Sequence, residues 1–125
     1  MAEDRRLTRL TKLALALPEV ERSLHGTHAT FTVRKKNFAY FLDDHHGDGI
    51  VALSCRAAPG ENTALIASDP ERFYMPSYVG PRGWVALRLD TPNVDWDEVA
   101  DLVTEAYLLA APKRLAAQLS RKPGS

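Results

Sequence analysis

The sequence predicts a single α+β domain, because segments of helical periodicity near its two ends enclose segments of strict alternation. Apolar residues recur every three or four positions in residues 4–17 and 96–109, whereas residues 28–34 and 84–89 place alternate side chains on two faces. A chain of 125 residues is long enough for one sizeable core and short for two.

The charge and cysteine content narrow the possible functions. Sixteen acidic and sixteen basic residues give a formal net charge of zero, which weighs against a strong nonspecific nucleic-acid binder. The charges are unevenly placed, since residues 22–42 contain four basic residues and no acid, and residues 90–105 contain six acids and no base. The single cysteine, Cys55, excludes an intrachain disulfide and a zinc site built from several cysteines.

We expect a cytoplasmic protein without a membrane partner. No run of eighteen apolar residues is present that could span a membrane. The N-terminus is charged and then amphipathic, which differs from the uninterrupted apolar region of a signal peptide.

The first predicted element is an amphipathic helix over residues 4–17. Its apolar stripe consists of Leu7, Leu10, Ala14 and Leu17. Asp4 suits the N-cap position, and Pro18 ends the helix. Residues 18–26 show neither period and are expected to be irregular.

Four strands are predicted in the middle of the chain. Residues 28–34 and 38–44 form a hairpin through a tight polar turn at 35–37, although this turn lacks the Asn-Gly signature. A third strand covers residues 50–55, a short helix covers 61–68, and a loop rich in proline and glycine leads to the fourth strand at 84–89. In this last strand Val85, Leu87 and Leu89 share one face, and Trp84 and Arg88 share the other.

The last third of the chain is predicted to be helical. Asp95 and Glu98 have the spacing of a capping box at the start of a helix. Pro112 suits the first position of a final short helix that ends near Leu119. We therefore assign residues 1–119 to one domain and residues 120–125 to a flexible C-terminal tail.

Three segments together resemble the MmcQ/YjbR family of small bacterial proteins: "HATFTVRKKNFAYF", "DPERFYMPSYVGPRGWVALRLD" and "VDWDEVADLVTEAYLLAAPKRLAAQL". The resemblance implies a double-wing fold, in which an antiparallel sheet has helices packed on one face. This fold is similar to the DNA-binding domain of a phage transcription factor, and members are commonly described as DNA-binding for that reason. The resemblance implies no catalytic residues.

The function that we expect is DNA binding through the open face of the sheet. Cationic groups bind phosphates, and flat rings stack on bases. The predicted contacts are Arg34, Lys35, Lys36, Arg82, Trp84 and Arg88. A structural role is an alternative for two of them, with Trp84 folded under the "YMPSYVG" loop and Arg88 paired with an acid.

A second function remains open. The loop at residues 74–81 could cover a groove that holds a peptide or a small molecule, with Trp84 and Tyr78 as anchors. No cofactor or metal is predicted, because the adjacent His45 and His46 would point apart in an extended loop. Cys55 is expected to be buried and inert, and no catalytic spacing is evident, so an enzyme is the weakest expectation.

Overall fold

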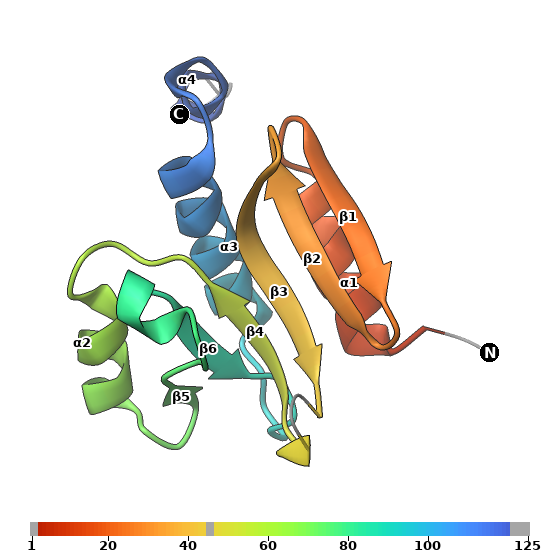
Figure 1. Cartoon of the computed structure of the whole chain (residues 1–125), viewed down its shortest axis with the longest axis vertical. Coiled ribbons are helices and arrows are strands. Elements are labelled where there is room, and N and C mark those ends of the chain that lie inside the picture. Colours follow the sequence, from red (N-terminus) through yellow and green to blue (C-terminus); the bar gives the residue numbers. More distant parts are fainter. Residues whose placement is uncertain (1–2, 45–46, 121–125) are drawn as a thin grey trace.

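The computed structural model describes residues 3–44 and 47–120. It contains one sheet of six strands in the order β1-β2-β3-β4-β6-β5 (Figure 1). All neighbouring strands are antiparallel. The strands are β1 (Val20–His25), β2 (His28–Val33), β3 (Lys36–Asp43), β4 (Val51–Cys55), β5 (Phe73–Tyr74) and β6 (Val85–Arg88).

Four α-helices accompany the sheet: α1 (Arg5–Leu15), α2 (Glu61–Ser68), α3 (Trp96–Ala110) and α4 (Lys113–Ser120). Helices α1 and α3 contact each other and lie against the same face of the sheet, whereas α2 lies beside β5 and β6 (Figure 1). The α+β prediction with helices on one face is therefore confirmed for the two long helices. No helix within residues 3–44 and 47–120 is long and apolar enough to cross a membrane.

The main core lies between the sheet and the pair α1 and α3. The predicted apolar stripes supply it, including Leu7, Leu10 and Ala14 from α1. A bulge in the pairing of β2 with β3 buries both Phe38 and Ala39, and Phe38 meets the Tyr107 ring edge-on at 5.8 Å between centroids. The bulge thus interrupts the strict alternation of β3 and places an additional large side chain, Phe38, against α3.

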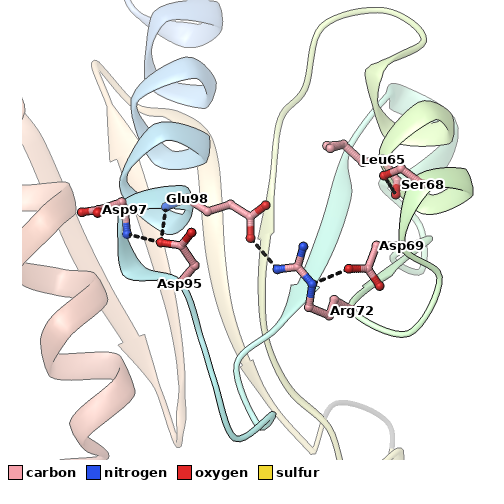
Figure 2. A network of polar contacts seen from close by, with 7 residues as sticks. All are labelled: Leu65, Ser68, Asp69, Arg72, Asp95, Asp97 and Glu98. Carbon is pink, nitrogen blue, oxygen red and sulfur yellow. Dashed lines mark hydrogen bonds and ion pairs between the residues drawn. The ribbon is translucent and has the colours of Figure 1, made fainter.

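The helix ends follow the predicted capping residues, with one difference. The Asp4 carboxylate accepts a hydrogen bond from the backbone N–H of Arg6, and Asp95 accepts from those of Asp97 and Glu98. The Glu98 carboxylate does not complete a reciprocal capping box but binds Arg72 at 2.6 Å. Figure 2 shows the Arg72 guanidinium between Glu98 and Asp69, so it ties the start of α3 to the segment between α2 and β5.

Two strands were not predicted. The segment expected to be irregular contains β1, which pairs with β2 from Val20 to His25. Most of its residues are exposed, so its composition carries little apolar alternation. The very short β5 lies within the predicted loop and is held only by pairing with β6. The hairpin turn also differs, because Arg34 and Lys35 form it with positive φ of 49° and 68° and Lys36 already belongs to β3.

The second face of the sheet, opposite α1 and α3, positions the candidate site. Every residue of β4 is buried, so both faces of this central strand are covered. The cover on the second face includes residues 76–79, which line a cavity together with side chains of β2, β3 and β4.

Candidate ligand-binding pocket

A cavity of about 350 Å³ lies between the second face of the sheet and the loop at residues 75–79, which we call the cover loop. The sheet provides one wall, with Ala29, Thr30, Tyr40, Leu42 and Ser54. The cover loop provides the other, with Pro76, Ser77, Tyr78 and Val79. His25 and His28 complete the lining near the turn between β1 and β2. The volume falls within the range of small-molecule sites.

The strand register explains why hydroxyl groups meet on this wall. Thr30 pairs with Tyr40, and Tyr40 pairs with Ser54, so three hydroxyl-bearing residues lie in one row across β2, β3 and β4. Directly paired residues project from the same face of an antiparallel sheet. Single positions that look unrelated in the sequence therefore form one continuous surface.

Ser54 is the most unusual member of this row. Its side chain is fully buried, and its Oγ has no hydrogen-bond partner among the described residues. A buried hydroxyl without a partner costs about 1–3 kcal/mol of stability. Because Ser54 lines the cavity, a bound molecule is well placed to supply the missing partner.

Tyr40, which lines the pocket, stacks on the buried Trp84. The Tyr40 ring lies nearly parallel to the Trp84 ring, with 4.9 Å between centroids and 19° between planes. The Asn37 side-chain amide donates to the Tyr40 hydroxyl at 3.1 Å, and the Arg56 guanidinium lies 5.7 Å from the Trp84 ring centroid. The Tyr40 hydroxyl is thus engaged at the hairpin end, while its ring borders the cavity.

The cover loop is anchored through Asn62 of α2. The buried Asn62 amide donates to the backbone carbonyls of Gly80 at 3.3 Å and Trp84 at 3.1 Å. Gly80 allows a close approach, because a Cβ at this position would lie 2.6 Å from the Met75 Sδ. The same amide donates to the Met75 Sδ at 3.7 Å, at the first residue of the loop. Between Met75 and Gly80 the loop exposes 80% of Tyr78, which adopts a positive φ of 67°. Asn62 thus contacts both ends of the loop, whereas Tyr78 faces solvent.

The pocket lining combines apolar and hydroxyl-bearing residues with two histidines, His25 and His28. Of the eleven described residues that line the pocket, none is an aspartate, glutamate, lysine or arginine. The site therefore suits a molecule without a strong charge.

The six predicted DNA contacts do not form one compact cluster. Arg34 and Lys35 lie in the hairpin turn and Lys36 starts β3, whereas Arg88 pairs with Ala52 near the opposite end of the sheet. Arg34 binds Glu19 at 2.5 Å, and its guanidinium lowers the pKa of that carboxyl. The DNA contact set stays a prediction.

Trp84 is buried and Arg88 is paired with an acid, as the structural alternative expects. Trp84 is only 4% exposed, and its backbone N–H donates to Val79 of the cover loop at 3.3 Å. Arg88 binds Asp90 at 2.9 Å. Arg82 is exposed and borders a shallow hollow with Arg56 and Trp84.

The sequence did not single out Ser54, Asn62 or Arg56. Ser54 stands in a buried apolar strand, and Asn62 stands near the start of a short polar helix, so neither position carries a local signal. Cys55 is buried as expected, and burial raises the pKa of its thiol to about 12. His45 and His46 lie outside the described residues, and no group of three potential metal ligands converges within the rest of the described chain.

The comparisons with known proteins agree with the fold. A crystal structure of the Deinococcus radiodurans protein DR2400, a DUF419 domain, matches with a TM-score of 0.71 and 20% identity, covering 95% of this chain and 94% of that chain. No match was found among curated proteins. The family model named YjbR matches residues 15–109, which is most of the chain. This chain therefore belongs to the YjbR family.

Proposed function

We propose that this protein binds a small, largely apolar molecule in the cavity between the cover loop and the sheet. The observation that carries this proposal is the cavity itself, which has a volume of about 350 Å³ and is lined on two sides by apolar and hydroxyl-bearing side chains. Cavities of this size and composition are the usual setting of small-molecule sites. This is the second of the two functions left open by the sequence.

The architecture around the cavity favours ligand binding over simple packing. The lining residue Ser54 has a hydroxyl without a hydrogen-bond partner among the described residues, and the Asn62 hydrogen bonds hold the segment that follows the cover loop. A wall formed by a paired sheet and a loop anchored beside it give a preformed site, which reduces the ordering cost of binding.

The test is a titration with 2-naphthol, a neutral aromatic probe, followed by ¹H–¹⁵N NMR. We expect chemical-shift changes at Leu42, Ser54 and Val79 in the wild type, since these residues line the cavity. Thr30→Trp should abolish these changes by filling the cavity. Thr32→Trp is the matched control, because Thr32 lies two positions along the same strand and is absent from the lining. Equal binding by both variants would reject the proposed site.

DNA binding is a second candidate, and one observation favours it. Lys35 and Lys36 are exposed at the hairpin end, and the Arg56 Nε donates to the Asn37 carbonyl at 2.7 Å beside them. Arg56 and Arg82 border the same hollow, so four cationic residues gather at this end of the sheet. Phosphate contacts need such clusters of lysine and arginine. Trp84, by contrast, is too deeply buried to stack on a base without movement.

Fluorescence anisotropy with labelled double-stranded DNA at about 50 and 200 mM salt tests this candidate. If these lysines contact phosphates, Lys35→Ala/Lys36→Ala should weaken binding to all sequences and reduce the salt slope by about 2. The control is Arg5→Ala/Lys12→Ala, which removes the same charge from exposed positions of α1 on the other side of the sheet. Equal effects of the two double variants would indicate only nonspecific electrostatic attraction between the protein and DNA, without a contact role for Lys35 and Lys36.

A further inference from the structure

We infer that the molecule bound in the pocket is uncharged, of about ten to fifteen non-hydrogen atoms, and carries one hydrogen-bonding group that meets the Ser54 hydroxyl. This inference rests on the proposed function, because it specifies the ligand class of the same cavity. The inference depends on three properties of the site: the charge of the lining residues, the volume of the cavity and the position of the unpartnered Ser54 hydroxyl.

The charge of the ligand follows from the lining. A buried charged group is strongly unfavourable unless an opposite charge or several hydrogen bonds compensate it. None of the eleven described lining residues is an arginine, a lysine, an aspartate or a glutamate. Arg88 lies outside this lining and already binds Asp90. The two lining histidines lie at the end of the pocket near the turn between β1 and β2. A phosphorylated metabolite or a dicarboxylate would therefore find no lysine or arginine among the described lining residues.

The size and shape follow from the two walls. The cavity holds about 350 Å³, which corresponds to roughly a dozen water volumes of about 30 Å³ each. One wall is the sheet surface, and the other is the cover loop with its buried Pro76 and partly buried Val79. A flat ring system fits between two such walls and can contact both.

The position of the polar group follows from Ser54. The Tyr40 hydroxyl already accepts a hydrogen bond from Asn37, so it is less available to a ligand. The Ser54 Oγ is buried in the sheet wall of the cavity and has no hydrogen-bond partner among the described residues. A serine hydroxyl can both donate and accept, so a phenol, an alcohol, an amide or a ring nitrogen can satisfy it. This single contact would fix the orientation of an otherwise apolar molecule.

Three probes that share one ring system test the inference: naphthalene, 2-naphthol and 2-naphthoate. Dissociation constants are measured from the NMR shifts of residues that line the cavity. We expect 2-naphthol to bind about 3- to 10-fold more tightly than naphthalene, as one neutral hydrogen bond provides. We expect 2-naphthoate to bind at least about tenfold more weakly than 2-naphthol, because its carboxylate finds no lysine or arginine among the described lining residues.

The variant Ser54→Ala isolates the hydrogen bond. It should remove the preference for 2-naphthol over naphthalene and leave naphthalene binding within about twofold of the wild type. Ser23→Ala is the matched control, since Ser23 is an exposed serine of β1 and is absent from the lining of the pocket. Ser54→Ala should fold normally, because it removes only an unpartnered hydroxyl.

The possible failures are distinguishable. If the probes bind in the pocket but 2-naphthoate binds as well as 2-naphthol, or if Ser54→Ala leaves the preference unchanged, the ligand class is wrong and the pocket stands. If none of the three probes shifts the signals of the lining residues, the proposed function itself fails.

Discussion

Tyr40 and Trp84 stack with their ring centroids 4.9 Å apart, and this contact joins the centre of the sheet to the base of the cover loop. Tyr40 borders the cavity, while the Trp84 carbonyl accepts the hydrogen bond from Asn62 that anchors the loop. The Trp84 indole thus supports a side chain that lines the pocket.

Replacement of Trp84 by alanine should therefore destabilise the protein strongly. The side chain is 4% exposed, and loss of a buried tryptophan costs about 3–5 kcal/mol. This is a large share of the total stability of a small domain. Urea unfolding followed by circular dichroism measures the effect. Arg82→Ala, two residues away and exposed, should change the free energy of unfolding by less than about 0.5 kcal/mol. Similar losses for the two variants would contradict a framework role for the indole.

Asn62→Ala should loosen the cover loop. The change leaves the Gly80 and Trp84 carbonyls without the amide that now donates to them, at a cost of about 1–3 kcal/mol. Hydrogen exchange should accelerate at Gly80, Arg82 and Trp84, whose amides bond within this segment. Asn62→Asp should be worse at neutral pH, because a carboxylate would face two carbonyl oxygens. Unchanged exchange in both variants would show that the loop is held in another way.

Ser54→Ala should raise the stability of the ligand-free protein slightly, by up to about 1 kcal/mol, because it removes a buried hydroxyl that has no partner among the described residues. Thermal unfolding measures this change. Ser77→Ala, at an exposed position of the cover loop, should be close to neutral. A clear loss of stability in Ser54→Ala would mean that the hydroxyl already makes a favourable interaction.

The Arg88–Asp90 pair should make stability depend on acid pH. The hydrogen bond from Arg88 lowers the pKa of Asp90 below its usual 3.8, so the pair stabilises the folded state above that pH. This contribution is lost as the pH falls below about 4 and through the folded-state pKa. Because Arg88 is 39% exposed, we expect no more than about 1 kcal/mol.

Asp90→Asn tests this pH dependence. It should lower stability at pH 7 and flatten the decline below pH 4 relative to the wild type, in urea unfolding curves measured from pH 2.5 to 7. Asp101→Asn, at an exposed position of α3, is the comparison variant. An identical acid dependence for the wild type and Asp90→Asn would show that this pair does not contribute.

The sequence predicted those parts of the fold that have a strong local pattern. Helix α3 was foreseen from the Asp95 cap and its apolar stripe, and β6 was foreseen from the alternation of Val85, Leu87 and Leu89. Strand β1 was missed because its side chains face mostly solvent, so its sequence does not alternate between apolar and polar residues. Its structure comes from pairing with β2, which is a property of the whole sheet.

The candidate site could be foreseen only in outline. The idea of a groove beneath residues 74–81 came from the density of aromatic and proline residues there. Ser54 and Asn62 could not be recognised, because their roles depend on contacts with residues at least 13 positions away in the sequence, across the sheet and the cover loop. Lys35, Lys36 and Arg82 are exposed, and Arg56, which borders the same hollow as Arg82, was not among the predicted contacts.

The most direct test of the central proposal is an isotope-filtered NOE experiment on the protein saturated with 2-naphthol. We expect intermolecular NOEs from the naphthol ring protons to the methyl groups of Leu42 and Val79, one on each wall of the cavity. NOEs confined to other surfaces, such as the exposed Leu108 and Leu109 of α3, would contradict a ligand site beneath the cover loop.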